Sequence, residues 1–487
     1  MGDKRTKIKA SLTKEMLEMG LDMVRQQYLA DSRPWVIGYS GGKDSTCVLQ
    51  LVWRALMSLP AESLRKPIYV VTSDTYVESP IVERHLAKML DSINAAAKKA
   101  SLPVEAIKVG PPAEDSFWVN LIGRGYPAPY NNFRWCTDRM KIQPTTSFIL
   151  SKVNQHGEVL ILLGARKAES GTRAQVMQQR REVGTMVFRH NSLPNAWVFT
   201  PIENWSTEDV WTYLTSTPPP WGGDNRDLIT MYRNAQAGEC PLVIDKSTPS
   251  CGGGRFGCWV CTVVDRDRTM EAMIDNGELW LQAMLDFRNW LAATGSNSTD
   301  KNSIRDFRRR TGRIQFYTDT QGCQQLIHGP FKVEFRKEIL RRLLETQIQL
   351  RSEGPDKDVS LIRDEELHQI RQIWLHEEGD WEDSLPAIYE RVMWERLEWL
   401  DDDWSGMGGA EKRVLEEAGR EYGVPDGLLI ELMDKEREFH GMSRRAGVYK
   451  ELHKILKKDW RSLEEAWADE KRKSPEETVI KEESRAN

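Results

Sequence analysis

The sequence has no long apolar run, few cysteines and no marked excess of one charge. Its apolar stretches fall far short of the roughly 20 residues that a membrane-spanning helix needs. Seven cysteines in 487 residues, without a stretch of the secretory type, exclude a disulfide framework. The 34 glycines and 22 prolines are too few for a collagen-like or low-complexity chain. These absences predict a soluble, intracellular protein of the cytoplasm with no membrane partner.

Charge and length narrow the class of protein further. The net charge of −5 excludes a uniformly basic nucleic-acid binder but permits local patches. A basic run at Arg305–Arg313 is either a DNA-binding surface or the solvated face of a helix. An acidic stretch over residues 377–403 is either a protein interface or a packed amphipathic helix. The length of 487 residues predicts two or three domains.

Strands and helices alternate in the first half of the chain. Apolar patterns predict helices over residues 13–30, 45–59 and 81–100, and strands over residues 35–39, 67–72, 104–109 and 158–163. This alternation predicts an α/β fold with a mainly parallel sheet. The loops after the strands should converge at one edge of the sheet, where ligands bind. We predict an α/β domain at 1–215, a cysteine-rich segment at 216–266 and a mostly helical region at 267–487.

The sequence Ser40-Gly-Gly-Lys-Asp-Ser45 follows the first predicted strand and begins the next helix. A turn of this kind presents backbone N–H groups and a helix N-terminus to an anion. It differs from a Walker-type loop, because Asp44 stands where that motif has Ser or Thr. The alternative is an ordinary glycine turn capped by serine. The groups predicted to bind phosphate are Ser40, Gly41, Gly42, Lys43 and Ser45.

Four segments of the chain are similar to the PP-loop ATP pyrophosphatase superfamily, and more narrowly to its phosphoadenylylsulfate reductase-like branch. Ser40–Ser45 resembles the PP-loop, and Asp74-Thr75 resembles an Asp-Thr-Gly segment in which Tyr76 replaces the glycine. Arg134-Trp-Cys136 and Leu163-Gly-Ala-Arg166 resemble two further segments. The resemblance spans about residues 35–215. It implies an adenine nucleotide alpha hydrolase-like sheet with helices on both faces, and cleavage of ATP between the α and β phosphates to adenylate a substrate.

Charged residues of these segments suit that chemistry. Arg166 and Arg173 can neutralise a triphosphate, and Asp44 and Asp74 can help to hold Mg²⁺. The alternatives are a helical ion pair of Arg173 with Glu169 and a capping role for Asp44. The predicted nucleotide site consists of Ser40, Gly41, Gly42, Lys43, Asp44, Ser45, Asp74, Thr75, Arg166 and Arg173. The residues predicted to take part in catalysis are Lys43, Asp44, Arg166 and Cys136.

Four of the seven cysteines lie in one glycine-rich segment, at Cys240, Cys251, Cys258 and Cys261. The closing Cys-x2-Cys pair can place two sulfurs on one metal centre. Four thiolates suit either tetrahedral zinc or a [4Fe-4S] cluster, and their spacing leaves this choice open. Four unrelated buried thiols are the third alternative.

A PP-loop domain followed by this cysteine spacing is similar to the DndC family of the bacterial DNA phosphorothioation (Dnd) system. The resemblance implies a [4Fe-4S] cluster on the four clustered cysteines and replacement of a non-bridging oxygen of the DNA backbone by sulfur. The partners that it implies are DNA, a cysteine desulfurase as sulfur donor, the ATPase DndD and the small DNA-binding protein DndE. Sulfonucleotide reduction is disfavoured, because Cys136 is single where cluster-bearing reductases have a pair and no cysteine follows Cys323.

The resulting hypothesis is a two-step reaction. ATP adenylates a non-bridging phosphate oxygen of DNA, and a persulfide or a sulfide from the cluster then attacks phosphorus and expels AMP. Cys136 is a candidate persulfide carrier; its alternative is a small packed residue beside Trp135. Two other classes of function stay open. One is a PP-loop enzyme for tRNA thiolation or sulfonucleotide reduction, and the other is a zinc-bearing, catalytically silent scaffold.

Overall fold

The structure is a computed structural model that describes residues 12–169, 186–226, 228–229, 232, 257–295, 301–400, 408–439 and 447–473. The chain divides into two compact units. The first unit comprises residues 1–117 and 129–289, and the second comprises residues 118–128 and 290–487. The second unit thus includes a short internal piece of the N-terminal half. The three domains expected from the sequence are defined by their expected functions as well as by packing. Their boundaries therefore stay predictions.

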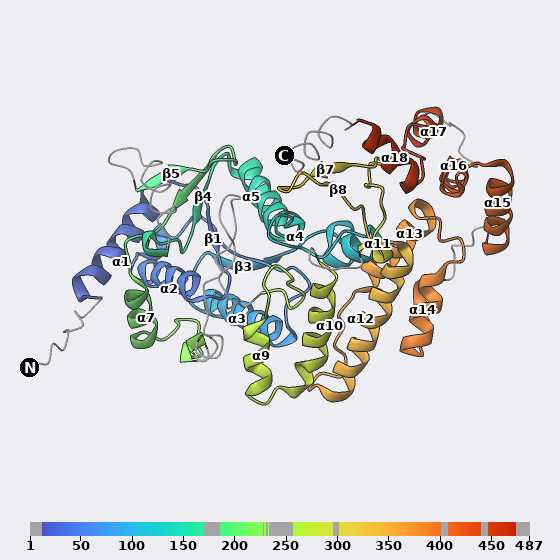
Figure 1. The fold of residues 1–487 in the computed structure, drawn as a ribbon. Coiled ribbons are helices and arrows are strands. Elements are labelled where there is room, and N and C mark those ends of the chain that lie inside the picture. The colour runs from blue at the N-terminus through green and yellow to red at the C-terminus, as the bar shows by residue number, and fades with distance from the viewer. Residues whose placement is uncertain are drawn as a thin grey trace, which may run out of the picture. The chain divides into compact units, whose positions relative to one another are not determined.

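A six-stranded sheet forms the centre of the first unit (Figure 1). Its order is β3-β2-β1-β4-β6-β5, and neighbouring strands run parallel except for β5, which is antiparallel to β6. The four strands expected from the sequence are confirmed, and β5 and β6 are additional. The bounds are β1 (Trp35–Gly38), β2 (Ile68–Ser73), β3 (Val104–Val109), β4 (Val159–Leu162), β5 (Val187–Arg189) and β6 (Ala196–Phe199).

Helices cover both faces of this sheet. One face packs against α1, α2, α3 and α7, and the other packs against α5. The three helices expected from the sequence are confirmed as α1, α2 and α3, within two residues at each end. The bounds are α1 (Lys14–Leu29), α2 (Lys43–Met57), α3 (Pro80–Lys99), α4 (Trp135–Thr137), α5 (Gln143–His156), α7 (Thr207–Ser216), α9 (Arg268–Asp275) and α10 (Gln282–Ala293).

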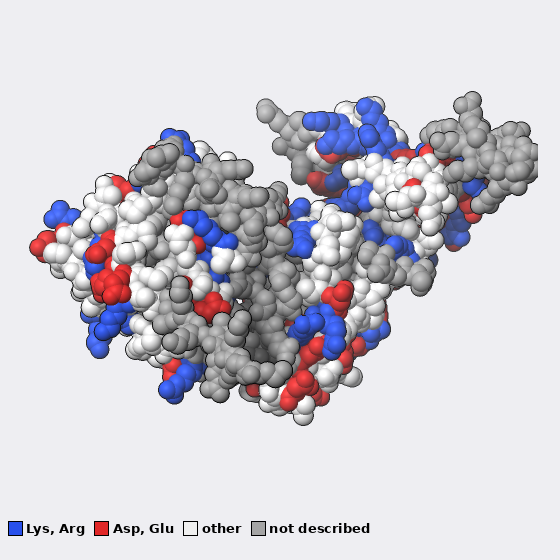
Figure 2. All heavy atoms as spheres, turned by 60° about the vertical axis from the view of Figure 1, so that its left-hand side comes forward, with Lys and Arg blue, Asp and Glu red and all other residues white. Residues whose placement is uncertain are grey.

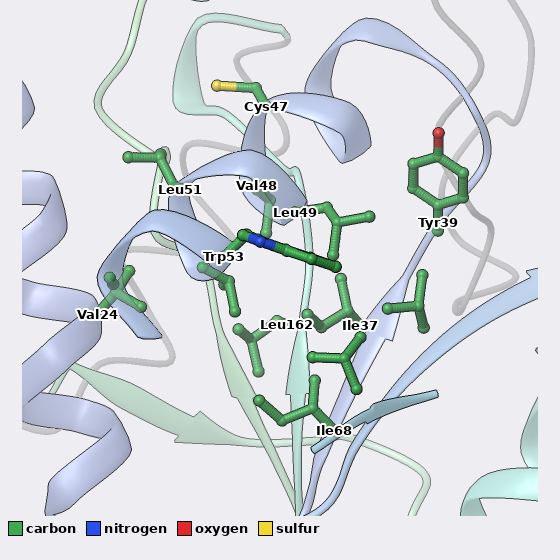
Figure 3. Packing of buried hydrophobic residues seen from close by; sticks show 14 of the residues in the cluster. Val24, Ile37, Tyr39, Cys47, Val48, Leu49, Leu51, Trp53, Ile68 and Leu162 are labelled. Atoms are coloured by element: carbon green, nitrogen blue, oxygen red, sulfur yellow. The ribbon is translucent and has the colours of Figure 1, made fainter. Parts of the chain in front are cut away.

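The core follows from the alternation of side chains along buried parallel strands. In β1, Ile37 belongs to the larger cluster under α2, whereas Val36 belongs to the smaller cluster under α5. Figure 3 shows Leu49 and Trp53 of α2 above Ile37 and Leu162 of the sheet. Because both faces are covered, strands of three to six residues suffice to build the sheet. The central strands are therefore rigid supports for the loops at their ends.

The second unit is mostly helical, as expected from the sequence. A small hairpin joins β7 (Phe316–Thr318) to β8 (Gln324–Leu326). Among the described residues, no helix combines the length and the hydropathy that a membrane span requires. The helices are α11 (Lys301–Ile304), α12 (Val333–Glu353), α13 (Asp364–Glu377), α14 (Ser384–Met393), α15 (Gly409–Tyr422), α16 (Asp426–Phe439), α17 (Val448–Leu456) and α18 (Leu463–Lys473).

Buried polar side chains hold residues 118–128 in the second unit. The Trp118 indole donates to the carbonyl of Leu361 at 2.6 Å, and the Trp374 indole donates to that of Ile122 at 3.0 Å. The guanidinium of Arg336, 2% exposed, donates to the carbonyl of Gly123 at 2.8 Å. The bonds to Ile122 and Gly123 satisfy carbonyl groups of a π-helical turn, Val119–Gly123, that burial would otherwise leave without partners.

We predict that Asp434 makes the second unit less stable as pH rises. Burial raises the pKa of Asp434 to about 6, although the Trp381 indole donates to its carboxylate at 2.6 Å. The folded unit therefore binds this proton more tightly than the unfolded chain does. The free energy of unfolding should fall between about pH 4 and pH 6, by on the order of 2 kcal/mol. Denaturant unfolding at several pH values measures the change.

The matched variant is Asp434→Asn, which keeps an oxygen acceptor for Trp381 and cannot ionise. It should lose most of the pH dependence within this window. A variant whose stability falls with pH as steeply as that of the original chain would contradict the assignment.

Candidate functional site

The turn between β1 and α2 has the backbone geometry of an anion-binding loop. Gly41 has φ of +70°, a conformation that favours glycine. The Ser45 hydroxyl donates to the Gly42 carbonyl at 3.1 Å and accepts the Ser40 N–H at 3.2 Å. Helix α2 then begins at Lys43, and its first N–H group donates to the Tyr232 hydroxyl at 3.2 Å. An oxygen atom of the protein thus lies at the helix N-terminus, where a phosphate oxygen is expected.

Two cations bracket the carboxylate of Asp44. Lys43 Nζ lies 3.0 Å from Oδ2, and Arg166 Nε donates to Oδ1 at 2.7 Å. Arg166 also donates to the Thr207 hydroxyl at 3.2 Å. Its side chain has 0% exposure, and that of Lys43 has 2%. The structure therefore brings three predicted site residues together, with Arg166 as a buried support of the loop.

Residue Gly164 lets the loop after β4 approach α2 closely. A Cβ atom at this position would lie 2.8 Å from the carbonyl carbon of Asp44 and 3.0 Å from the backbone nitrogen of Ser45. These are backbone atoms, which cannot move aside as the end of a side chain can. The glycine of Leu163-Gly-Ala-Arg166 is therefore required by packing against the phosphate loop.

The loop after β2 carries the predicted residues Asp74 and Thr75. Asp74 Oδ2 lies 2.6 Å from Lys108 Nζ, and Oδ1 accepts the Tyr76 N–H at 2.9 Å. The Glu78 carboxylate accepts the Thr75 hydroxyl at 2.5 Å and the Thr75 N–H at 3.1 Å. Both acidic side chains thus stabilise the turn in which Thr75 is fully buried.

The segment with Cys258 and Cys261 lies directly against this loop. The Trp259 N–H donates to the Val77 carbonyl at 2.9 Å, and Glu78 and Cys258 form an antiparallel bridge. The Thr75 hydroxyl lies 3.3 Å from Cys258 Sγ, within hydrogen-bonding distance. The predicted nucleotide edge of the sheet and the predicted sulfur segment therefore touch within the first unit.

Cys136 belongs to the same group of thiols. Burial raises the pKa of the Cys136 thiol to about 11, and the nearby Cys261 raises it further. Burial also raises the pKa of Cys258 to about 12, with Glu78 and Cys136 acting in the same direction. The ammonium of Lys141 opposes both shifts. Without a metal ion both thiols are protonated at neutral pH, so a metal centre that binds Cys258 must displace its proton.

The described part of the predicted four-cysteine set is its closing pair. Cys261 donates its N–H to the Cys258 carbonyl at 3.1 Å, so both cysteines lie on one tight turn and line one small cavity. Thiol donors on such a turn suit zinc or iron–sulfur binding. Cys240, Cys251 and Arg173 lie outside the described residues. Within the described ranges, no three His, Cys, Asp or Glu side chains converge with the geometry of a metal site.

The basic run of the second unit is not a helical face. It follows α11, and the guanidinium groups of its first four arginines donate to backbone carbonyls of other segments, at distances of 2.5–3.2 Å. Arg305 and Arg309 donate to the carbonyl of His328, Arg308 donates to that of Asp459, and Arg310 donates to that of Arg124. The expected alternative of a solvated helix is thus wrong. On the face drawn in Figure 2, basic and acidic side chains are interspersed over the described surface.

The described part of the acidic stretch is also engaged within the second unit. Glu378 pairs with Arg336 at 2.8 Å, and Asp383 pairs with Arg371 at 2.8 Å. Trp394 is 87% exposed at the end of α14. Residues 401–403 lie outside the described ranges. These carboxylates therefore contribute to folding, and the interface expected from the sequence stays a prediction.

Four residues near the site were not among the predicted site residues. Glu78 follows Asp74-Thr75 and Lys141 follows Cys136, in segments that carry the family resemblance. Their closeness in sequence to predicted site residues could therefore have identified them. Tyr232 and Arg288 have no local signal, because each reaches the site from a distant part of the chain.

Residues 34–220 match the family model of the phosphoadenosine phosphosulfate reductase domain. This span is less than half of the chain, but it includes all six strands of the sheet, the phosphate loop and both loops described above. This part of the chain is thus similar in sequence to phosphoadenosine phosphosulfate reductase domains.

Two further proteins are similar over part of the chain. An uncharacterized protein of Methanocaldococcus jannaschii is 24% identical over 261 residues, which are 53% of this chain and 42% of that protein. The chain therefore spans less than half the length of this relative. The U34-tRNA thiolase NcsA from Methanococcus maripaludis, solved with its [4Fe-4S] cluster, is a structural match at 12% identity. Its TM-score is 0.27, over 57% of this chain and 78% of that one.

We predict that Gly164→Ala displaces the phosphate loop. The added methyl group would overlap backbone atoms of Asp44 at 2.8 Å, so the free energy of unfolding should fall by about 1–3 kcal/mol. Binding of ATP should weaken as well. Denaturant unfolding and equilibrium titration with ATP measure the two effects.

The control is Gly20→Ala in α1, where the nearest atom beyond the helix itself, a ring carbon of Trp205, is 3.7 Å from the new methyl group. Alanine is the better helix former, so this variant should be as stable as the original chain or slightly more stable. If both variants have equal stability and equal ATP affinity, the phosphate loop accommodates the methyl group without loss of free energy. The requirement for glycine at position 164 would then be wrong.

Proposed function

We propose that this chain is the ATP-dependent sulfurtransferase of a DNA phosphorothioation system, in the manner of the DndC family. The first unit would cleave ATP to AMP and pyrophosphate and adenylate a non-bridging oxygen of the DNA backbone. Thiols beside the same loops would then deliver sulfur to the activated phosphorus. The contact of Thr75 with Cys258 at 3.3 Å supports this proposal most directly, because it joins the nucleotide edge to a thiol.

ATP would bind with its phosphates at the N-terminus of α2. Gly41 and Gly42 allow close approach, and the loop between Ser40 and Ser45 is already ordered by its own hydroxyl bonds. Lys43 would exchange its bond to Asp44 for a phosphate oxygen. Arg166 would then remain on Asp44 and hold the loop in place.

Mg²⁺ would arrive with ATP rather than occupy a prepared site. Each oxygen of Asp44 already faces a cation, and the oxygens of Asp74 face Lys108 and the Tyr76 N–H. Either carboxylate could therefore bind Mg²⁺ only after a lysine moves to a phosphate. In this role the metal ion would polarise the α-phosphate and neutralise the leaving pyrophosphate.

The sulfur step balances if the donor is a persulfide on Cys136. Its terminal sulfur attacks the adenylated phosphorus, and AMP leaves with the former DNA oxygen. A thiol reductant then attacks Cys136 Sγ, breaks the S–S bond and leaves the sulfur on DNA. The mixed disulfide of Cys136 with this reductant is reduced by a second thiol before the next cycle. Lys141 would favour the thiolate forms that this sequence of steps needs.

We also propose that Cys240, Cys251, Cys258 and Cys261 hold a [4Fe-4S] cluster. The tight turn of the closing pair and the purely thiol donor set suit such a cluster. When bound, it would supply iron that binds or activates sulfur next to the nucleotide edge.

The proposed partners are DNA, a cysteine desulfurase, the ATPase DndD and the small protein DndE. DNA modification requires contact with backbone phosphates, which arginine and lysine side chains provide. In the second unit, Arg310 and Arg313 are exposed and are candidates for such contacts. The cysteine desulfurase would deliver sulfur to the thiols of the first unit.

Mass spectrometry of nucleic acids distinguishes this function from its alternatives. The chain is expressed with a cysteine desulfurase and the other Dnd proteins in a host without phosphorothioate DNA. Phosphorothioate dinucleotides should appear in digests of DNA, and thiolated nucleosides in tRNA should not increase. The opposite result would favour tRNA thiolation. Stoichiometric zinc without iron in anaerobically purified protein would favour the silent scaffold.

We predict that Lys43→Met reduces the release of pyrophosphate from ATP by about 100-fold, because a buried positive charge beside the phosphates is lost. The matched control is Lys66→Met, since Lys66 is also a buried lysine paired with an aspartate, Asp31, at 3.2 Å. Lys66 precedes β2, at the opposite edge of the sheet from the loop. The control should lose stability but keep ATP cleavage per folded molecule. Equal cleavage by both variants would contradict the assignment of the loop.

We predict that Cys258→Ser loses most of the bound iron and all DNA modification but still cleaves ATP. None of the proposed phosphate-binding groups is altered, and the serine hydroxyl can still contact Thr75. Iron content, pyrophosphate release and thermal unfolding are measured on the same preparation. The control is Cys323→Ser, whose thiol is exposed in the hairpin between β7 and β8 and should be without effect. A stable Cys258→Ser protein without ATP cleavage would show that the two sites act as one.

A further inference from the structure

Arg288 is a buried arginine whose bonds converge on the loop of Cys258 and Cys261. It lies on α10, and it is 1% exposed. Its Nε donates to the Cys261 carbonyl at 2.9 Å, and Nη1 donates to the Asp265 carbonyl at 2.9 Å. Nη2 donates to the Val264 carbonyl. One side chain therefore binds three carbonyl groups of the turn that follows the Cys-x2-Cys pair.

The charge of this guanidinium is not matched by a directly bonded carboxylate. Its described hydrogen bonds go to backbone carbonyls and to the side-chain oxygen of Asn289 at 2.9 Å. Burying a cation costs free energy unless negative charge lies nearby. The loop carbonyls supply partial negative charge, and the carboxylates of Asp267 and Asp265 act on the guanidinium from nearby without bonding to it. Thiolates at Cys258 and Cys261, formed when a metal centre binds, would add negative charge on the side of the cysteine pair.

We propose that Arg288 is the positioning residue of the sulfur site, which holds the Cys258–Asp265 loop in its ligand-binding shape and offsets the charge of its thiolates. The proposal rests on the metal centre proposed above. The planar fork of arginine suits this role, because it can bind several carbonyls at once from one fixed position. A lysine would keep the charge but donate from a single point.

The second unit offers a matched control for a purely structural arginine. Arg336 is also buried, at 2% exposure, and it donates to the carbonyls of Phe331 at 2.6 Å and Gly123 at 2.8 Å. It differs from Arg288 in that Glu378 pairs with it at 2.8 Å and no cysteine belongs to the segments it binds. Loss of Arg336 should therefore reduce stability without altering the sulfur site.

The experiment uses the full-length protein, reconstituted anaerobically with iron and sulfide. Iron per polypeptide, the midpoint potential of the bound centre and thermal unfolding are measured for Arg288→Gln, Arg288→Lys and Arg336→Gln. Arg288→Gln should retain less than half of the iron, and the remaining centre should have a more negative midpoint potential, because a nearby positive charge favours the reduced form. Arg288→Lys should also retain less iron, with a midpoint potential close to that of the original protein. Arg336→Gln should leave iron content and potential unchanged.

The outcomes separate this inference from the proposed function. If the original protein binds no iron, the proposed centre fails and the role of Arg288 fails with it. If the original protein binds iron and Arg288→Gln retains the same content and potential, only the role of Arg288 is overturned. If Arg288→Gln does not fold, Arg288→Lys decides: full iron retention would refute the positioning role. The midpoint potential of Arg288→Lys is also compared with that of a neutral variant, Arg288→Met. If both variants shift the potential equally, the role of the positive charge is refuted.

Discussion

Parallel pairing of β1 with β2 on one side and β4 on the other is the constraint on which the site depends. Parallel strands end at the same edge of a sheet, so their following loops become neighbours whatever their separation in sequence. The phosphate loop, the Asp74–Glu78 turn and the Gly164–Arg166 turn meet in this way. The absence of a side chain at Gly164 then allows the approach that the pairing of Asp44 with Arg166 requires.

Most charges at this edge are satisfied by the protein itself. Asp44 lies between Lys43 and Arg166, and Asp74 pairs with Lys108. Buried ion pairs contribute little net stability, because desolvation offsets their attraction. Here the ion pairs hold the loops in position. When a triphosphate binds, its negative charge can replace that of the carboxylates as the partner of the lysines.

Thiols and nucleotide loops share one unit because the Cys258 segment adds a backbone bridge to the turn after β2. This bridge fixes Cys258 Sγ against Thr75, while the carbonyl bonds of Arg288 fix the following turn. The cysteine pair is thus held from two sides by bonds that need no metal ion. Such a pair is positioned before a metal arrives, which reduces the ordering cost of binding.

Charge runs in a sequence are poor guides to surfaces. The arginines of residues 305–310 look like an exposed patch, but all four bind carbonyls of the second unit and three of them are only partly exposed. Arginine is suited to this because its stem and planar head can be buried while each N–H finds an oxygen. Whether a run of arginines faces solvent depends on which segments pack against it. The amino-acid composition of the run does not show this.

The sequence by itself determined the first four strands, helices α1 to α3 and the loop at Ser40–Ser45. These features are local: strand and helix periods, a Gly-Gly turn and a following serine are written within a few residues. Only the tertiary structure decided that Arg166 supports Asp44, that Cys136 lies with Cys258 and Cys261, and that Arg288 holds their turn. Each of these contacts joins residues more than 20 positions apart, and burial and strand order, rather than spacing, bring them together.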